Sequence, residues 1–96
     1  MDLTINLNQP LKDFKGESIK DQDGKEIAIK DIMIQAVMRN AEKEDGKQKM
    51  RRFDLASAFY SQEDYKFDAD DLKFVKDEIA SIYAPLIVGA AYKLLG

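Results

Sequence analysis

The chain begins with hydrophobic residues at every second position, whereas from about residue 31 onward the hydrophobic spacing becomes helical. Successive side chains of a strand point to opposite faces, so alternation places one side of an extended segment in the interior. The pattern predicts a strand or ordered arm over residues 1–15, with Leu3, Ile5 and Leu7 on its inner side. The polar residues between them leave open the alternative that the arm is disordered in the free protein.

Residues 18–29 are predicted to form a β-hairpin. Two short alternating runs flank Asp23-Gly24, a dipeptide that favours a tight turn because glycine accepts positive φ angles. The same segment hints at a calcium loop, but with Gly24 at the sixth position the twelfth falls on Lys30, where a bidentate Glu is required. We therefore assign Asp23-Gly24 to turn structure.

Two helices are predicted next. The apolar spacing from Asp31 predicts a helix that continues to Glu44-Asp45-Gly46, where glycine can end it. A second helix is predicted over about residues 47–62, and its apolar residues cover so much of the circumference that packing on more than one side is expected. These apolar residues are Met50, Phe53, Ala56, Phe59 and Tyr60.

The third helix has the clearest start signal in the chain. Asp68 is the expected N-cap, Asp71 follows three residues later, and Phe67 with Leu72 can form a hydrophobic staple. The expected core stripe of this helix is Leu72, Val75, Ile79 and Ile82.

A fourth helix is predicted from Pro85 to Leu95, because proline lacks the amide hydrogen of an interior residue but suits the first helical position. It is apolar nearly all round, which predicts either a central core helix or one whose burial a second subunit completes. The fold class expected is mainly α: a small bundle of three to four helices after an arm and a hairpin. With 96 residues the chain has the length of a single domain, with a helical body over 31–96.

Histidine and cysteine are both absent from the sequence. This removes the commonest general base and the usual nucleophile pairs, so we expect a non-enzymatic protein with no catalytic, metal-binding or cofactor-binding residue. The acidic pairs Asp70-Asp71 and Asp77-Glu78 are assigned to solvated helix faces, since adjacent helical residues point about 100 degrees apart.

Apolar run length and cysteine content bear on localisation. No stretch approaches the ~20 apolar residues of a membrane span, and the first residues lack the pattern of a signal peptide. The lack of cysteine fits a reducing compartment. We expect a cytoplasmic protein without a membrane partner.

The one basic concentration is a candidate contact site for a partner or a phosphate. Nearby acidic residues dilute it, the chain has a net charge of −3, and no glycine-rich phosphate loop accompanies it. A small nucleic-acid-binding regulator is therefore the alternative to a protein-binding function, and salt bridges within the chain are a further interpretation of Arg52 and Asp54. The candidate residues are Lys47, Lys49, Arg51 and Arg52.

A second set of candidate contact residues is apolar or aromatic. Tyr65 is interpreted either as packing at the core edge or as an interface anchor, since buried aromatic residues often dominate protein interfaces. The last helix supplies Leu86, Tyr92 and Leu95, which would meet a second copy if the protein forms a homo-oligomer.

Residues 16–96 resemble small uncharacterised proteins encoded by tailed bacteriophages and prophages. The resemblance implies a bacterial host cell, or incorporation in a virion, and a role in virion assembly or in acting on a host protein. It implies no activity and transfers no functional residue. The segments that carry it are Asp23-Gly24-Lys25, Ile29-Lys30-Asp31-Ile32, Lys49-Met50-Arg51-Arg52-Phe53-Asp54-Leu55-Ala56 and Tyr83-Ala84-Pro85-Leu86-Ile87-Val88-Gly89.

Overall fold

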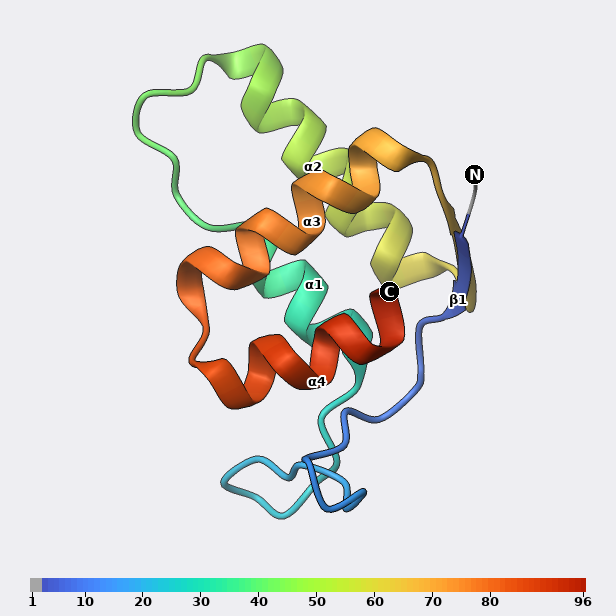
Figure 1. The fold of residues 1–96 in the computed structure, drawn as a ribbon. Coiled ribbons are helices and arrows are strands. Elements are labelled where there is room, and N and C mark those ends of the chain that lie inside the picture. Colours follow the sequence, from blue (N-terminus) through green and yellow to red (C-terminus); the bar gives the residue numbers. More distant parts are fainter. Residues whose placement is uncertain (1–2) are drawn as a thin grey trace.

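The computed structural model describes residues 3–96, which form four helices and two short strands (Figure 1). The predicted mainly α fold is confirmed. In chain order the elements are β1 (Leu3–Asn6), α1 (Ile29–Val37), α2 (Gly46–Ser61), β2 (Asp64–Phe67), α3 (Ala69–Ile82) and α4 (Pro85–Leu95).

One hydrophobic core joins all of these elements. α1 lies in the middle of the bundle and packs against α2, α3 and α4, which surround it (Figure 1). Full burial of an aliphatic or aromatic side chain of this size stabilises a fold by about 1.5–3 kcal/mol. The largest fully buried side chains are Phe59, Phe67, Leu7, Leu11, Ile29 and Met33.

The N-terminal arm is part of this core. β1 pairs antiparallel with β2, so that Leu3 lies opposite Phe67 and Ile5 lies opposite Tyr65. Ile5 and the following Leu7 are buried, as the alternating pattern predicts. The alternative of a disordered arm is not what the structure shows from Leu3 onward, because β1 pairs with β2 and also contacts α4. Met1 and Asp2, the first residues of the predicted arm, lie outside the described residues.

Two turns of the same design connect β1 to α1. In the first turn, Asp13 Oδ1 accepts hydrogen bonds from the amides of Lys15 and Glu17, at 2.8 and 3.0 Å. In the second turn, Asp21 Oδ1 accepts the equivalent bonds from two amides at 2.9 and 3.0 Å. Gly16 and Gly24 end the turns with φ angles of 83° and 79°, which only glycine adopts readily.

An eight-residue repeat underlies these turns: residues 11–18 read Leu-Lys-Asp-Phe-Lys-Gly-Glu-Ser, and residues 19–26 read Ile-Lys-Asp-Gln-Asp-Gly-Lys-Glu. The repeat closes a triangle of backbone hydrogen bonds, in which Leu11 N–H donates to Ile27, Ile27 to Ile19, and Ile19 to Leu11, at 2.8–2.9 Å. The predicted pairing across residues 18–29 is present as the bridge between Lys20 and Glu26. The turn between Asp21 and Lys25 holds three residues. The two-residue turn that Asp-Gly favours requires a positive φ at both positions, and here only Gly24 has one.

The first helix is shorter than predicted. α1 ends at Val37, and residues 38–45 form a loop up to the start of α2, although the apolar spacing predicts helix as far as Glu44. Side chains of this loop reach other helices: Arg39 bonds Glu78, and Glu44 bonds Arg52. If α1 continued to Glu44, Arg39 and Glu44 would need other partners for their charges.

α3 and α4 begin where predicted. The Asp68 side chain accepts a hydrogen bond of 2.7 Å from the Asp71 amide, and Pro85 occupies the first turn of α4. The predicted stripe of α3 is wrong at Ile82, which is exposed near the end of the helix. α4 is not a central core helix either, because only one side of it is buried, through Ala90, Ala91 and Leu95.

Candidate partner-binding surface

α2 presents two different sides. Its start is fixed by a capping box, in which the Asp45 side chain bonds the Gln48 amide and the Gln48 side chain bonds the Asp45 amide. The inner side of the helix packs on the core. The buried residues of that side are Arg52, Leu55, Ala56 and Phe59.

The outer side of α2 carries three large hydrophobic residues in the open. Met50, Phe53 and Tyr60 are 54, 53 and 74% exposed. Their spacing of three and seven residues places them along one face of the helix, and we call this set the α2 stripe. The prediction that α2 packs on more than one side is wrong within the described chain. Grouped exposed hydrophobic residues of this kind are typical of protein interaction sites.

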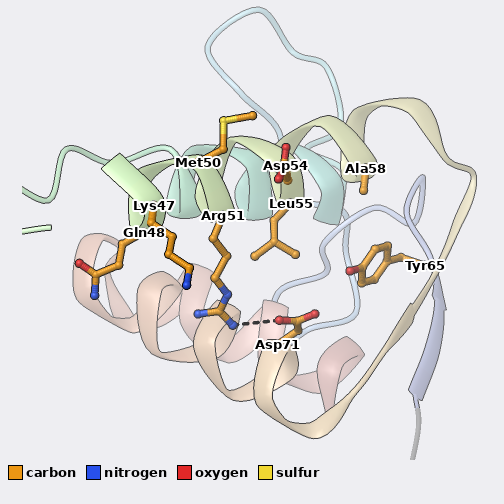
Figure 2. A pocket seen from close by; sticks show the side chains of 9 residues that line it. All are labelled: Lys47, Gln48, Met50, Arg51, Asp54, Leu55, Ala58, Tyr65 and Asp71. Atoms are coloured by element: carbon orange, nitrogen blue, oxygen red, sulfur yellow. Dashed lines mark hydrogen bonds and ion pairs between the residues drawn. The ribbon is translucent and has the colours of Figure 1, made fainter. Parts of the chain in front are cut away.

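A groove lies between α2, β2 and the start of α3, and of the stripe residues Met50 alone is among those that line it (Figure 2). Figure 2 shows Leu55 and Tyr65 pointing into this hollow, while Lys47 and Arg51 reach across it from α2 toward α3. Its volume is about 820 Å³, and we call it the α2 groove. Its lining residues are Lys47, Gln48, Met50, Arg51, Asp54, Leu55, Ala58, Tyr65 and Asp71.

Arg51 lies on the rim of the α2 groove. Its guanidinium forms an ion pair of 2.9 Å with Asp71 on α3 and lies 4.3 Å from the centre of the Phe74 ring. Half of the Arg51 side chain stays exposed, so the group is held in place yet reachable by a partner. Cation–π contact and a partly exposed ion pair each contribute on the order of 0.5–1 kcal/mol.

Tyr65 forms one wall of the groove. Its ring packs edge-on against Phe59 and Phe67, with centroids 5.0 and 4.7 Å away. Burial, together with the carboxylates of Asp71 and Asp68, raises the pKa of the Tyr65 hydroxyl. The hydroxyl is therefore protonated at neutral pH and can donate a hydrogen bond. Both predicted interpretations of Tyr65, packing at the core edge and contact with a partner, are compatible with this position.

Arg52 is placed differently from the other candidate cations. Only 4% of it is exposed, and its guanidinium makes two 2.6 Å bonds to Glu44, one of 3.0 Å to Glu78 and one of 3.2 Å to the Val37 carbonyl. Arg52 therefore cannot serve as a surface contact for a phosphate or a partner. The salt-bridge interpretation holds for it instead.

Glu78 is the centre of this buried ion network. The prediction that Glu78 lies on a solvated helix face is therefore wrong. It is 7% exposed and is bound by both Arg52 and Arg39. Burial alone would raise the pKa of the Glu78 carboxyl, but the hydrogen bonds from the two arginines outweigh it and lower the pKa. The hydrogen bonds from Arg52 lower the pKa of Glu44 as well.

The network ties α1, α2, α3 and the loop of residues 38–45 together, so it serves the fold. Of the predicted basic site, Lys47, Lys49 and Arg51 remain on the surface. Arg51 already pairs with Asp71, and Asp54 also lines the groove. The remaining positive charge is weaker than the sequence indicates, which counts against the nucleic-acid alternative.

The structure separates the three predicted interface residues of α4. Leu86 is exposed, whereas Leu95 is fully buried and offers no surface to a second copy. Tyr92 is half-buried, and its hydroxyl donates a 2.9 Å hydrogen bond to the Lys76 carbonyl on α3. Leu95 and Tyr92 therefore hold α4 on the bundle.

Over residues 3–96, no group of three or more acidic side chains is arranged to hold a metal ion. None of the helices described is long and apolar enough to cross a membrane. Comparisons with protein-family models, with curated protein sequences and with solved structures find no match.

Proposed function

We propose that the protein is a non-enzymatic interaction module that binds a protein partner through the α2 stripe and the α2 groove. The observation that carries this proposal is the exposure of Met50, Phe53 and Tyr60 along one face of a well-capped helix. Water contact of these side chains is unfavourable by about 25 cal/mol for each Å² of apolar surface. A partner that covers them would recover that free energy.

The groove adds selectivity to the stripe. Leu55, Ala58 and Tyr65 offer an apolar floor, and Arg51 stands beside it as a positioned donor. Interfaces commonly combine aromatic residues and arginine at their centre with polar groups at the rim. The resemblance to phage and prophage proteins supports a viral or bacterial host protein as the partner.

The proposal can be tested by site-specific crosslinking. The photoreactive residue p-benzoylphenylalanine replaces Phe53 in one tagged sample and Ile82 in a control sample, since Ile82 is also an exposed hydrophobic residue. Both samples are irradiated in lysate of prophage-bearing bacteria and analysed by mass spectrometry. We expect one protein to be crosslinked at position 53 and not at position 82. Crosslinking to nucleic acid alone, or equal crosslinking at both positions, would contradict the proposal.

A further inference from the structure

A second exposed surface lies where the first turn meets α4, at the end of the molecule opposite to the start of α2 (Figure 1). Phe14 at the tip of this turn is 81% exposed, more than any other large hydrophobic residue described. Two adjoining hollows, of about 610 and 150 Å³, separate Phe14 from α4. Exposed Leu86 lines the smaller one and Ala90 lines both.

The turn does not require a phenylalanine. The second turn has the same pair of bonds to its aspartate and the same glycine geometry, yet it carries Gln22-Asp23 where the first carries Phe14-Lys15. The two turns therefore show that the backbone is satisfied with polar residues at these positions. Phe14 is too exposed to add much packing to the fold, and with exposed Leu86 across the smaller hollow it forms an apolar patch of the kind that binding partners cover.

The charge around Phe14 is positive. Lys12, Lys15 and Lys93 line the larger hollow, and the only carboxylate among its lining residues is that of Asp13. One oxygen of that carboxylate already accepts two backbone hydrogen bonds in the turn. This local excess of cations occurs in a chain with a net charge of −3, so the surface differs from the protein as a whole. The excess of positive charge around the larger hollow favours negatively charged ligands.

We propose that this surface, formed by the first turn and α4, binds an acidic peptide segment of a second protein partner. An apolar side chain of the segment packs between Phe14 and Leu86, and its carboxylates lie beside Lys12, Lys15 and Lys93. This inference goes beyond the proposed function, because the surface shares no residue with the α2 stripe or the α2 groove. With both surfaces in use, the protein bridges two partners.

The test is selection from a random-peptide display library on the immobilised full chain. Two double variants exchange the turn tips: Phe14→Gln/Lys15→Asp gives the first turn the residues of the second, and Gln22→Phe/Asp23→Lys does the reverse. Both keep the turn aspartates and glycines, so both are expected to fold like the wild type. The second variant is the matched control, because the second turn does not line the hollows beside α4.

We expect the selected peptides to carry Asp or Glu around a large apolar residue. Their affinity should fall about tenfold or more in Phe14→Gln/Lys15→Asp, stay unchanged in the control, and weaken at roughly 0.3 M salt. Selection of neutral or basic peptides, or of none that depend on Phe14 and Lys15, would overturn the inference. So would Phe14-dependent binding to phosphatidylserine vesicles without acidic peptides, or Phe14-dependent self-association in sedimentation. Neither variant alters α2, so these outcomes leave the proposed function standing.

Discussion

Arg51 and Arg52 are adjacent on α2 and both lie over the Phe74 ring, yet they point about 100 degrees apart around the helix and do different things. Arg52 faces inward, is almost fully buried and binds two carboxylates and a carbonyl. Arg51 faces the groove, has one carboxylate partner and stays half exposed. The inner side of α2 therefore stabilises the bundle, whereas Arg51 and the α2 stripe stay about half exposed or more. We propose that the exposed residues serve recognition, and this division of roles can be tested.

The largest effect is expected from Arg52→Leu. The substitution leaves Glu44 without its strongest partner and deprives buried Glu78 of one of two cations, and breaking a buried ion pair costs about 3–5 kcal/mol. The free energy of unfolding, measured in urea, should fall by an amount in that range. The matched control Arg51→Leu should lose no more than about 2 kcal/mol, because it removes one half-exposed ion pair and one cation–π contact. Equal losses of unfolding free energy in the two variants would contradict this division of roles.

A smaller loss is expected on acidification. The pKa of Glu78 is lowered in the folded state, so its stabilising contribution is complete above the unfolded pKa of about 4.3 and disappears as the pH falls through the folded value. Thermal unfolding should therefore be insensitive to pH near neutrality and shift to lower temperature below about pH 4.5. In Glu78→Gln the midpoint at neutral pH should be lower, and the acid-induced shift should be reduced. An unchanged acid profile in that variant would mean that the network does not act as described.

A still smaller effect is expected at the start of the helix. Asp45→Ala removes the hydrogen bond that the Asp45 side chain accepts from the Gln48 amide. Loss of such a cap typically costs about 1 kcal/mol. This change shortens or frays the first turn of α2 and leaves the buried network in place. Chemical denaturation should show a loss of free energy well below that of Arg52→Leu. Asn at position 45, which can still accept the amide hydrogen bond, should restore most of the stability.

The smallest effect on stability is expected on the outer side. Replacing Met50 or Phe53 singly by Ser should change the free energy of unfolding by less than about 0.5 kcal/mol, since each side chain is at least half exposed. Tyr60→Ser also removes the contact of the ring with the Lys30 ammonium, 5.6 Å from its centroid, and should lose no more than about 1 kcal/mol. Urea unfolding of the three variants checks this. A loss like that of a core residue would show that the stripe is structural.

Much of the fold could be predicted because its signals are local. The Asp68 cap, Pro85 and the Asp-Gly turn each fix backbone structure through their own chemistry, and all three are found where the sequence places them. The alternating arm was also recognisable as extended. Its partner strand β2 was not predicted, because Tyr65 was considered only for core-edge packing or partner contact and Phe67 only as part of a staple for the third helix.

The errors concern contacts between distant residues. The end of α1 and the burial of Glu78 both depend on ion pairs that join segments 26 to 39 residues apart, and hydrophobic periodicity carries no information about such pairs. Counting apolar residues around α2 likewise could not reveal which of its sides would meet the bundle. One signal was present and missed: the eight-residue repeat identifies Phe14 as the apolar exception at a polar turn position.

The central claim is that the outer side of α2 binds a protein partner. The most direct measurement is quantitative affinity capture from prophage-bearing lysate, comparing the wild type with Met50→Ser/Phe53→Ser/Tyr60→Ser and with the control Met38→Ser/Ile82→Ser, which also removes exposed hydrophobic residues. We predict one stoichiometric protein captured by the wild type and the control and lost by the triple variant, with the unfolding midpoint preserved in all three. Capture of the same protein by the triple variant, or recovery of nucleic acid in place of any protein, would contradict the account.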